Sequence, residues 1–303
     1  MDTSDLAKRM KDYEMRDRYF LQKRIPVAIR VDMRAGHTFT KGFERPFDKV
    51  FMKSMQETAK YMCENMENAK FAYVQSDEIT IILVDYDTLE TDCWFNYRTD
   101  KLCSISASMA TMAFNKYFAQ EVDKWGVKTF GWEWYEGGTN DPELINTPEW
   151  KLAKIYSKAI DKGAMFDARC FNIPKEEVAN LIYWRQLDAI RNSIQMVGQA
   201  YFSHKELQNK NCNMIQDMLH EEKGINWNDF PIHLKRGSCC IKIETATIFA
   251  TEKEDGSIQT GAIERPHWEI DTEIPLFKEE GRQYINRRIL YEEASEVKIA
   301  YIN

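Results

Sequence analysis

The spacing of apolar and polar residues predicts a chain of alternating strands and helices. Runs rich in β-branched and aromatic residues predict strands over about residues 25–32, 71–74, 79–84 and 164–171. Only the polar segment 75–78 separates the two middle runs, so they are expected to form a hairpin. Two adjacent carboxylates lie in that short turn, which makes it the most informative segment of the chain.

Longer segments repeat their apolar residues with the period of a helix. Helices are predicted over about residues 4–20, 45–62, 98–122 and 173–197, the last continuing or restarting near its middle. The segment 124–150 combines tryptophans with a glycine- and proline-containing run, so it is interpreted as an irregular insertion and the best linker candidate. From about residue 231 the pattern predicts short strands alternating with turns, over Ser238–Ile243, Thr245–Thr251 and Trp268–Ile274.

The order of these elements predicts an α+β fold. Strand, helix, strand–turn–strand, helix and strand follow one another, which is the order of a ferredoxin-like core with an antiparallel sheet and flanking helices. This is also the layout of a polymerase-type palm. The segments after the core predict a C-terminal extension of helices and β-hairpins.

Acidic residues are expected to meet at one end of this sheet. Asp32 follows the first strand, Asp77 and Glu78 lie in the hairpin turn, and the interval between Asp32 and Asp77 leaves room for one crossover helix. Buried carboxylates are costly unless they are neutralised, and divalent cations prefer carboxylate oxygens. Two such carboxylates holding Mg²⁺ are typical of phosphoryl or nucleotidyl transfer. The alternative is a pair of solvated acids in turns.

Composition is that of a soluble globular protein. The chain has 303 residues, of which 44% are hydrophobic and 29% charged, and no apolar run approaches the length needed to span a bilayer. The start of the chain lacks an apolar signal segment, and the seven cysteines lack metal-ligand spacing, so a reducing, cytoplasmic location is expected. The net charge of −7 disfavours an extended nucleic-acid surface, although basic residues cluster locally at 8–11, 16–24, 98–101 and 235–236.

Several motifs resemble those of the tRNA-His guanylyltransferase family. They are Val31 to Thr40, Phe43 to Asp48, Tyr73 to Glu78, Phe166 to Arg169 and Tyr183 to Asp188, in the family's order. The family usually has glycine at the position of Met33 and an aromatic residue at that of Gly36. Ile190 to Ser193 stand where the eukaryotic guanylyltransferases carry a His-Ile-Asn-Asn segment. The chain therefore resembles the bacterial and archaeal guanylyltransferase-like branch, which resembles a template-dependent polymerase that repairs truncated tRNA 5′ ends.

The resemblance implies a reaction and its participants. Members of the family have a palm and extend tRNA at its 5′ end in the 3′-to-5′ direction, with ATP or GTP as substrates. By resemblance, two Mg²⁺ ions would be held by Asp32, Asp77 and the Met33 carbonyl, while Glu78 would complete the acidic site. Residues implied to bind nucleotide are Asp32, Met33, Arg34, Ala35, Gly36, His37, Arg45, Ser76, Asp77, Arg98 and Lys101.

The resemblance also suggests how the domains are organised and how many subunits associate. Residues 1–150 would form the palm-like core with the metal and nucleotide site, and 151–303 would add the remaining palm strand and a part for RNA binding and oligomerisation. A homotetramer that binds tRNA across subunits is expected. Two further sites stay open: Lys235 and Arg236 either contact RNA or carry incidental charge, and the polar residues of 185–192 either face RNA or form a buried ion pair.

Two other functions are compatible with the same palm. One is a nucleotide cyclase or signal-nucleotide synthase, and the other is a tRNA-binding protein that has lost catalysis. A cyclic product made without RNA would indicate the first. Retention of tRNA without turnover of triphosphate would indicate the second.

Overall fold

A single mixed sheet organises the molecule. The computed structural model describes residues 3–134, 145–252, 258–290 and 297–301, and its strands lie in the order β4-β1-β3-β2-β5-β6, with β7 parallel to β5 and all other neighbours antiparallel. The strands are β1 (Val27–Met33), β2 (Ala69–Gln75), β3 (Glu78–Leu83), β4 (Phe166–Asn172), β5 (Ser238–Glu252), β6 (Ile258–Asp271) and β7 (Val297–Tyr301).

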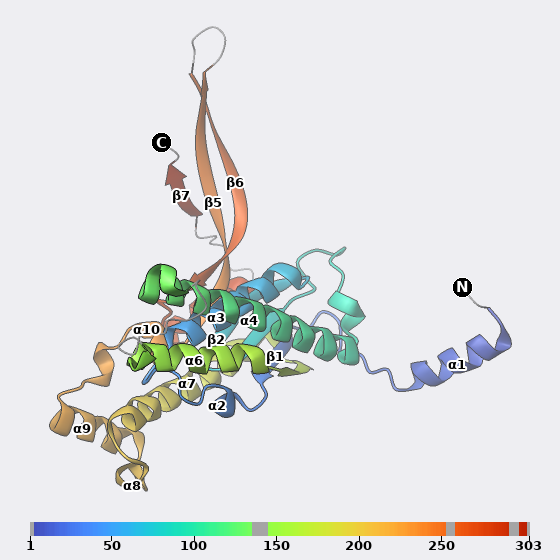
Figure 1. Ribbon diagram of the computed structural model, residues 1–303. Helices are drawn as coiled ribbons and strands as arrows, with labels where there is room; N and C mark the ends of the chain where they lie inside the picture. The colour runs from blue at the N-terminus through green and yellow to red at the C-terminus, as the bar shows by residue number, and fades with distance from the viewer. Residues whose placement is uncertain (1–2, 135–144, 253–257, 291–296, 302–303) are drawn as a thin grey trace.

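Helices connect and cover these strands (Figure 1). The α-helices are α1 (Asp5–Arg16), α2 (Gly36–Phe39), α3 (Lys49–Asn65), α4 (Thr99–Phe130), α6 (Pro148–Lys162), α7 (Val178–Tyr201), α8 (His204–Leu207), α9 (Cys212–Lys223), α10 (Ile232–Arg236) and α11 (Gln283–Ile289). Short 3₁₀ helices are η1 (Trp94–Tyr97), η2 (Gly131–Trp134), η3 (Lys175–Glu177), η4 (Trp227–Asp229) and η5 (Glu279–Arg282).

The core has the predicted ferredoxin-like topology. Its chain order β1-α3-β2-β3-α4-β4 and its strand order β4-β1-β3-β2 are those of a split βαβ fold, which confirms the palm-like α+β prediction. The predicted helices at 4–20, 98–122 and 173–197 correspond to α1, α4 and a continuous α7. The helix expected from 45 begins only at Lys49, and the short α2 was not predicted.

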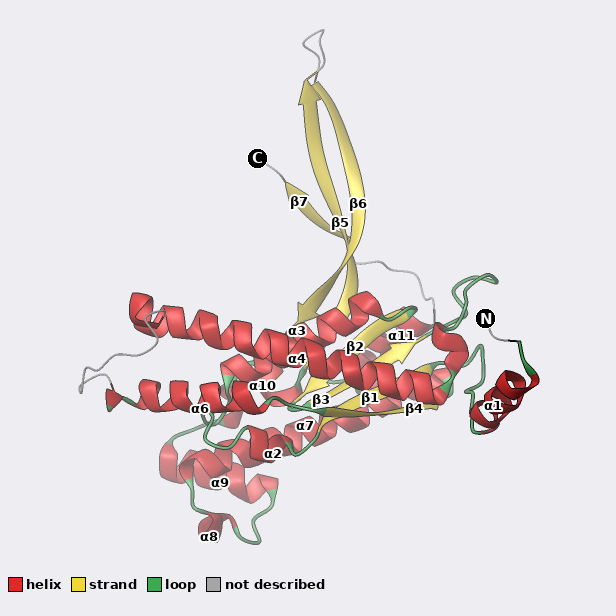
Figure 2. Ribbon diagram, turned by 45° about the vertical axis from the view of Figure 1, so that its right-hand side comes forward, coloured by secondary structure: helices red, strands yellow, loops and turns green. Residues whose placement is uncertain are grey.

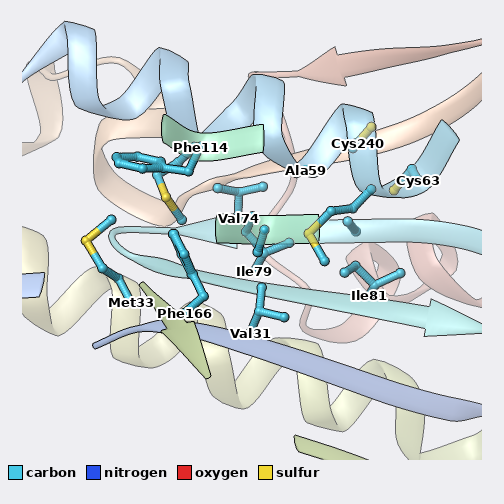
Figure 3. Close-up of a cluster of buried hydrophobic side chains, with 14 of the residues drawn as sticks. Val31, Met33, Ala59, Cys63, Val74, Ile79, Ile81, Phe114, Phe166 and Cys240 are labelled. Carbon is cyan, nitrogen blue, oxygen red and sulfur yellow. The ribbon is translucent and has the colours of Figure 1, made fainter. Parts of the chain in front are cut away.

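Helices cover both faces of the palm part of the sheet, β4-β1-β3-β2 (Figure 2). Ile29, Val31 and Met33 of β1 join the apolar cluster beneath α3 and α4, part of which is drawn in Figure 3. Ala28 belongs to the opposite cluster, beneath α7 and α11. Because side chains alternate along a strand, Arg30 and Asp32 also point to the α7 face. This alternation determines which helix can contact the acidic site.

The C-terminal strands differ from the prediction of short segments. β5 and β6 form one antiparallel hairpin paired from Cys239 opposite Asp271 to Glu252 opposite Ile258. The first residues of β5 pair with β2, so the base of the hairpin extends the palm sheet. Beyond that base the two strands project from the body as an arm, with β7 alongside (Figures 1 and 2). Local alternation predicted the strands but not their joining into a single long hairpin.

The proposed linker at 124–150 is largely structured where it is described. Trp125 lies inside α4, whose end at Phe130 is later than predicted, and it packs edge-to-face on Tyr156 of α6 at a centroid distance of 5.2 Å. Trp134 packs on Phe130. The irregular-insertion interpretation is therefore wrong for 124–134, where aromatic packing continues the core, and the glycine-containing run at 137–142 lies outside the described residues.

A buried carboxylate sets the start of α3. Asp48 caps the helix by accepting hydrogen bonds from the Phe51 amide (2.8 Å), the Glu44 amide (2.9 Å) and the Tyr156 hydroxyl (2.6 Å). Three donors satisfy the hydrogen-bonding capacity of this buried carboxylate. This cap ties the segment before α3 to α6.

The substitution Tyr156→Phe is expected to lower the free energy of unfolding by about 2 kcal/mol, since a hydrogen bond to a buried charged group is lost while the ring is retained. Urea denaturation followed by circular dichroism measures the change. Tyr117→Phe on α4 is the matched control and should change the free energy of unfolding by less than about 0.5 kcal/mol. A Tyr156→Phe value as small as that of the control would contradict this account of the cap.

Candidate functional site

The acidic residues predicted from the sequence do converge at one end of the sheet. Asp32 of β1 lies directly opposite Glu78 of β3 in the strand register. Ser76 and Asp77 form the turn between β2 and β3, and Ser76 has a φ of 47°. The Met33 amide donates a hydrogen bond to the Asp77 carbonyl at 3.0 Å, which fixes the turn against the end of β1.

Several carboxylates gather at this end of the sheet, with Arg169 among them. Burial, followed by the nearby carboxylates of Asp77, Glu78 and Asp167, raises the pKa of Asp32 to about 6. The charged form of Asp32 is thus disfavoured in the folded protein. Ionised Asp32 therefore destabilises the fold. The destabilisation is fully present above the folded-state pKa of about 6, and it disappears as the pH falls from there to the ordinary carboxyl pKa of 3.8.

Asp32→Asn should therefore stabilise the metal-free protein at pH 7.5 by about 1 kcal/mol, a value reduced from the full pKa shift because the carboxyl group is only partly buried. The gain should vanish as the pH is lowered from 6 to 4. Thermal melting of both proteins in EDTA across this range measures it. An equal melting temperature at pH 7.5 would contradict the prediction.

Glu78 is engaged by arginines instead of facing open solvent. Arg185 of α7 donates to both carboxylate oxygens, from Nε to Oε1 at 2.7 Å and from Nη2 to Oε2 at 2.9 Å. Arg30 approaches Oε2 at 3.8 Å, and Arg185 also donates to Asp188 at 2.9 Å. Glu78 and Arg185 are each 8% exposed. The buried-ion-pair interpretation thus holds for Arg185, whereas Arg191, which pairs with Asp188, is exposed.

A cavity of about 600 Å³ opens beside the carboxylates. It is bordered by the β2–β3 turn, by the segment that follows α2, and by the helices α7 and α10. Its wall includes five residues that the sequence assigned to nucleotide binding or catalysis: Gly36, His37, Arg45, Ser76 and Asp77. Its volume lies in the range of small-molecule sites. The other assigned residues Arg34 and Ala35 are exposed next to it, and Ala35, not Met33, has the positive φ (55°) at this turn.

Polar side chains that the sequence mostly did not single out also line the cavity. They include Gln56, Gln75, Asn192, Ser193, His233 and Ser238. Among the described residues, Gln75 Oε1 and His233 Nδ1 are buried without a hydrogen-bond partner, and burial lowers the pKa of His233. Buried polar atoms are normally paired, so these two suit a ligand with complementary groups. The sequence offered one sign of this site: Gln56 and Gln75 are polar residues at positions where the apolar pattern of a helix and a strand predicts core residues.

The structure does not bring Arg98 and Lys101 to the carboxylates. They lie at the start of α4, where the Cys170 thiol contacts the Thr99 carbonyl at 3.8 Å. Cys170 is opposite Ile29 in the strand register, and Ile29 precedes Asp32 by three residues. The start of α4 therefore lies beside a part of β1 that is about 10 Å along the strand from Asp32. Arg98 forms an ion pair with Asp100 at 2.8 Å instead.

The carboxylates fit Mg²⁺ bound together with a nucleotide. In the part of the chain that the structure describes, no three His, Cys, Asp or Glu side chains are grouped as a metal site. Mg²⁺ at nucleotide sites needs only one or two protein carboxylates, because waters and substrate phosphates complete its coordination. Asp32 and Asp77 supply two, and their mutual repulsion is what a bound dication would relieve.

A ferredoxin-like sheet with a carboxylate pair at one end and a cavity of nucleotide size beside it places the protein among the palm-type nucleotidyltransferases. The family model of the tRNAHis guanylyltransferases (Thg1) matches residues 7–174. The chain belongs to the tRNAHis guanylyltransferase family.

Individual relatives agree with this assignment. A bacterial tRNA(His) guanylyltransferase (Thg1)-like protein solved with ATP is 35% identical, with a TM-score of 0.71 over 94% of this chain and 99% of that one. The structure with GTP gives 34% identity and a TM-score of 0.67 over the same shares. The tRNA(His) guanylyltransferase of Saccharomyces cerevisiae is 26% identical over 70% of this chain and 80% of its own length. Among the described residues, no helix is long and apolar enough to cross a membrane.

Proposed function

We propose that the protein is a Mg²⁺-dependent enzyme that adds nucleotides to the 5′ end of tRNA in the 3′-to-5′ direction, either as a tRNA-His guanylyltransferase or in repair of truncated 5′ ends. The observation that carries the proposal is the carboxylate pair Asp32 and Asp77 beside a nucleotide-sized cavity, in a chain of this family. ATP and GTP are proposed as substrates, since the solved bacterial relatives bind them.

Asp32, Asp77 and the Met33 carbonyl would hold two Mg²⁺ ions, which supply charge stabilisation at the phosphates when bound. Asp77 also lies against the backbone of Gly36, which keeps its carboxylate at the cavity wall. Ser76, His37 and Arg45 line the same wall and are proposed to contact the nucleotide. Gln75 and His233, which line the cavity and have buried polar atoms without a partner, are proposed to hydrogen-bond the base.

Other predicted residues take more limited roles in this proposal. Glu78 completes the acidic site indirectly, because its carboxylate is already bound by Arg185 and Arg30. Arg34 and Ala35 would cover the phosphates from outside. Arg98 and Lys101 are not proposed to bind the nucleotide held by the same subunit.

The test is incubation of the purified protein with α-labelled GTP, Mg²⁺ and tRNA lacking its first nucleotide. Label is expected at the 5′ end of the tRNA, and EDTA should prevent it. Label at the 3′ end, or a labelled cyclic nucleotide formed without RNA, would overturn the proposal. Binding of tRNA with no consumption of GTP would indicate that catalysis has been lost.

Gly36→Ala is expected to reduce nucleotide addition by about 10²-fold, the effect typical of an ångström-scale displacement of a catalytic group. A Cβ atom at this position would lie 2.0 Å from Asp77 Oδ2, so the carboxylate must move. Single-turnover kinetics with saturating GTP measures the loss. The control Gly224→Ala adds backbone strain at a φ of +66° but meets no atom within 4 Å, and should leave the rate unchanged.

The organisation of the whole protein is also part of the proposal. Residues 1–150 would supply the metal and nucleotide site, and 151–303 the last palm strand with surfaces for RNA and oligomer contacts. A homotetramer is proposed from the family resemblance. The exposed apolar residues Leu6, Met10, Tyr13 and Met15 of α1, a helix with no buried residue, favour contact between copies of the chain. Light scattering would measure the mass. The seven free cysteines agree with a cytoplasmic location.

A further inference from the structure

An exposed tryptophan stands over two arginines next to the acidic site. Trp184 of α7 is 54% exposed, although it lies on a helix that packs against the sheet. The guanidinium carbon of Arg185 is 4.6 Å from the centre of its ring, and that of Arg30 is 6.0 Å away. Trp184 does not line the nucleotide cavity. Binding of a nucleotide in the cavity therefore gives Trp184 no function.

The arginines that support the indole are themselves fixed. Both bind the Glu78 carboxylate, Arg185 through two hydrogen bonds and Arg30 at 3.8 Å. Burial of Arg185 and Glu78 keeps this arrangement out of solvent. The ring is thus held in place from below by a buried network, and little conformational entropy is lost when a flat ligand stacks on its open part.

The position of the ring is set by the strand register. Arg30 precedes Asp32 by two residues on the same face of β1, which corresponds to about 7 Å. Glu78 is directly opposite Asp32 and adjacent to Asp77. The indole is therefore next to the carboxylates, on the face of the sheet covered by α7. A terminal nucleotide whose 5′ phosphate lies at the carboxylates has its base within reach of Trp184.

The surroundings of Trp184 favour a polyanion. Arg169 lies opposite Arg30 in the strand register and is half exposed, Arg191 is exposed further along α7, and Arg34 is exposed after β1. Asp167 and Asp188 neutralise two of these arginines in part, through the pairs with Arg169 and Arg191. An aromatic ring surrounded by arginines is the combination that binds RNA ends, by stacking with a base and by attraction of phosphates.

We propose that Trp184 is the stacking platform for the base of the 5′-terminal nucleotide of the RNA substrate, with Arg169 and Arg34 attracting the adjoining phosphates. This rests on the proposed function, because it assumes that the RNA 5′ end is brought to Asp32 and Asp77. The incoming triphosphate occupies the cavity instead, so Trp184 contributes to the affinity for RNA and not to that for GTP.

The experiment measures binding of fluorescently labelled, 5′-truncated tRNA by anisotropy at one fixed salt concentration, without nucleotide. Wild type is compared with Trp184→Ala, Trp184→Phe and the control Tyr201→Ala, an exposed aromatic on the same helix about 25 Å away. Each protein is also tested on the same RNA with an abasic 5′-terminal nucleotide, and on RNA with an abasic 3′-terminal nucleotide. Thermal melting verifies that each variant is folded.

Trp184→Ala is expected to bind the intact RNA about tenfold more weakly, while Trp184→Phe recovers most of the affinity and Tyr201→Ala loses none. The 5′-abasic RNA should bind wild type about tenfold more weakly and show no further loss with Trp184→Ala. The KM for GTP should not change. Equal binding of intact RNA by wild type and Trp184→Ala overturns the inference.

Two other results would also overturn it. One is a loss that persists on the 5′-abasic RNA, which would mean that the ring does not contact that base. The other is a loss that disappears only on the 3′-abasic RNA, which would mean that the ring stacks on the 3′-terminal base. Since binding is measured without turnover, a failure of the labelling assay with the expected binding result would refute the proposed reaction and leave the platform intact.

Discussion

Asp77→Asn is expected to lower the rate of nucleotide addition at least about 10³-fold. Loss of one carboxylate removes part of the binding site for the metal ions, which contribute several kcal/mol of charge stabilisation in the transition state, and about 4 kcal/mol corresponds to this factor. Asparagine has nearly the same size, so the turn between β2 and β3 should keep its hydrogen bond from the Met33 amide to the residue 77 carbonyl. Single-turnover addition of labelled GTP to truncated tRNA measures the rate.

Two controls separate loss of the carboxylate from loss of the fold. Asp161→Asn removes an exposed acid of α6 and should leave the rate unchanged. Binding of Mg²⁺ supplies a readout independent of catalysis: the metal should raise the melting temperature of wild type more than that of Asp77→Asn. A rate for Asp77→Asn within tenfold of that of wild type would mean that Asp77 does not bind the catalytic metal ions.

The sequence was sufficient to predict the palm because its determinants are local. Each core strand has its own apolar pattern, and the turn at 75–78 is short enough to force the hairpin that carries Asp77. Asp32 and Asp77 are placed by strand ends, so their convergence follows from the topology. The helices α1, α4 and α7 were predicted for the same reason, with errors of several residues at their ends.

The parts that were not predicted depend on contacts between distant residues. The partner of Glu78 is Arg185, 107 residues away, and no local pattern connects them. The same holds for Gln75 and His233, which line one cavity only because β2 and α10 both border it. Arg98 and Lys101 resemble a phosphate-binding pair by their motif, but the position of α4 along the sheet takes them away from Asp32.

Arg185→Ala is expected to lower the free energy of unfolding by about 3–5 kcal/mol, the range for removal of one partner from a buried ion pair. Arg185 donates two hydrogen bonds to Glu78 and one to Asp188. Its removal leaves the buried Glu78 carboxylate with the more distant Arg30 and a 3.4 Å hydrogen bond from the Thr80 hydroxyl. Urea denaturation followed by fluorescence measures the loss. Arg191→Ala, which removes an exposed arginine from the same Asp188, should cost less than about 1 kcal/mol.

A double variant distinguishes the unpaired charge from the lost packing of the arginine side chain. If the uncompensated carboxylate is the main cost, adding Glu78→Gln to Arg185→Ala should recover about half of the loss, because the glutamine is uncharged. Glu78→Gln alone should be destabilising, since it leaves Arg185 as the buried unpaired charge. The sum of the losses in free energy of unfolding for the two single variants would then exceed the loss for the double variant. The difference measures the coupling between the two side chains. Strictly additive losses would mean that the two side chains stabilise the fold independently and that the ion pair is not the source of the cost.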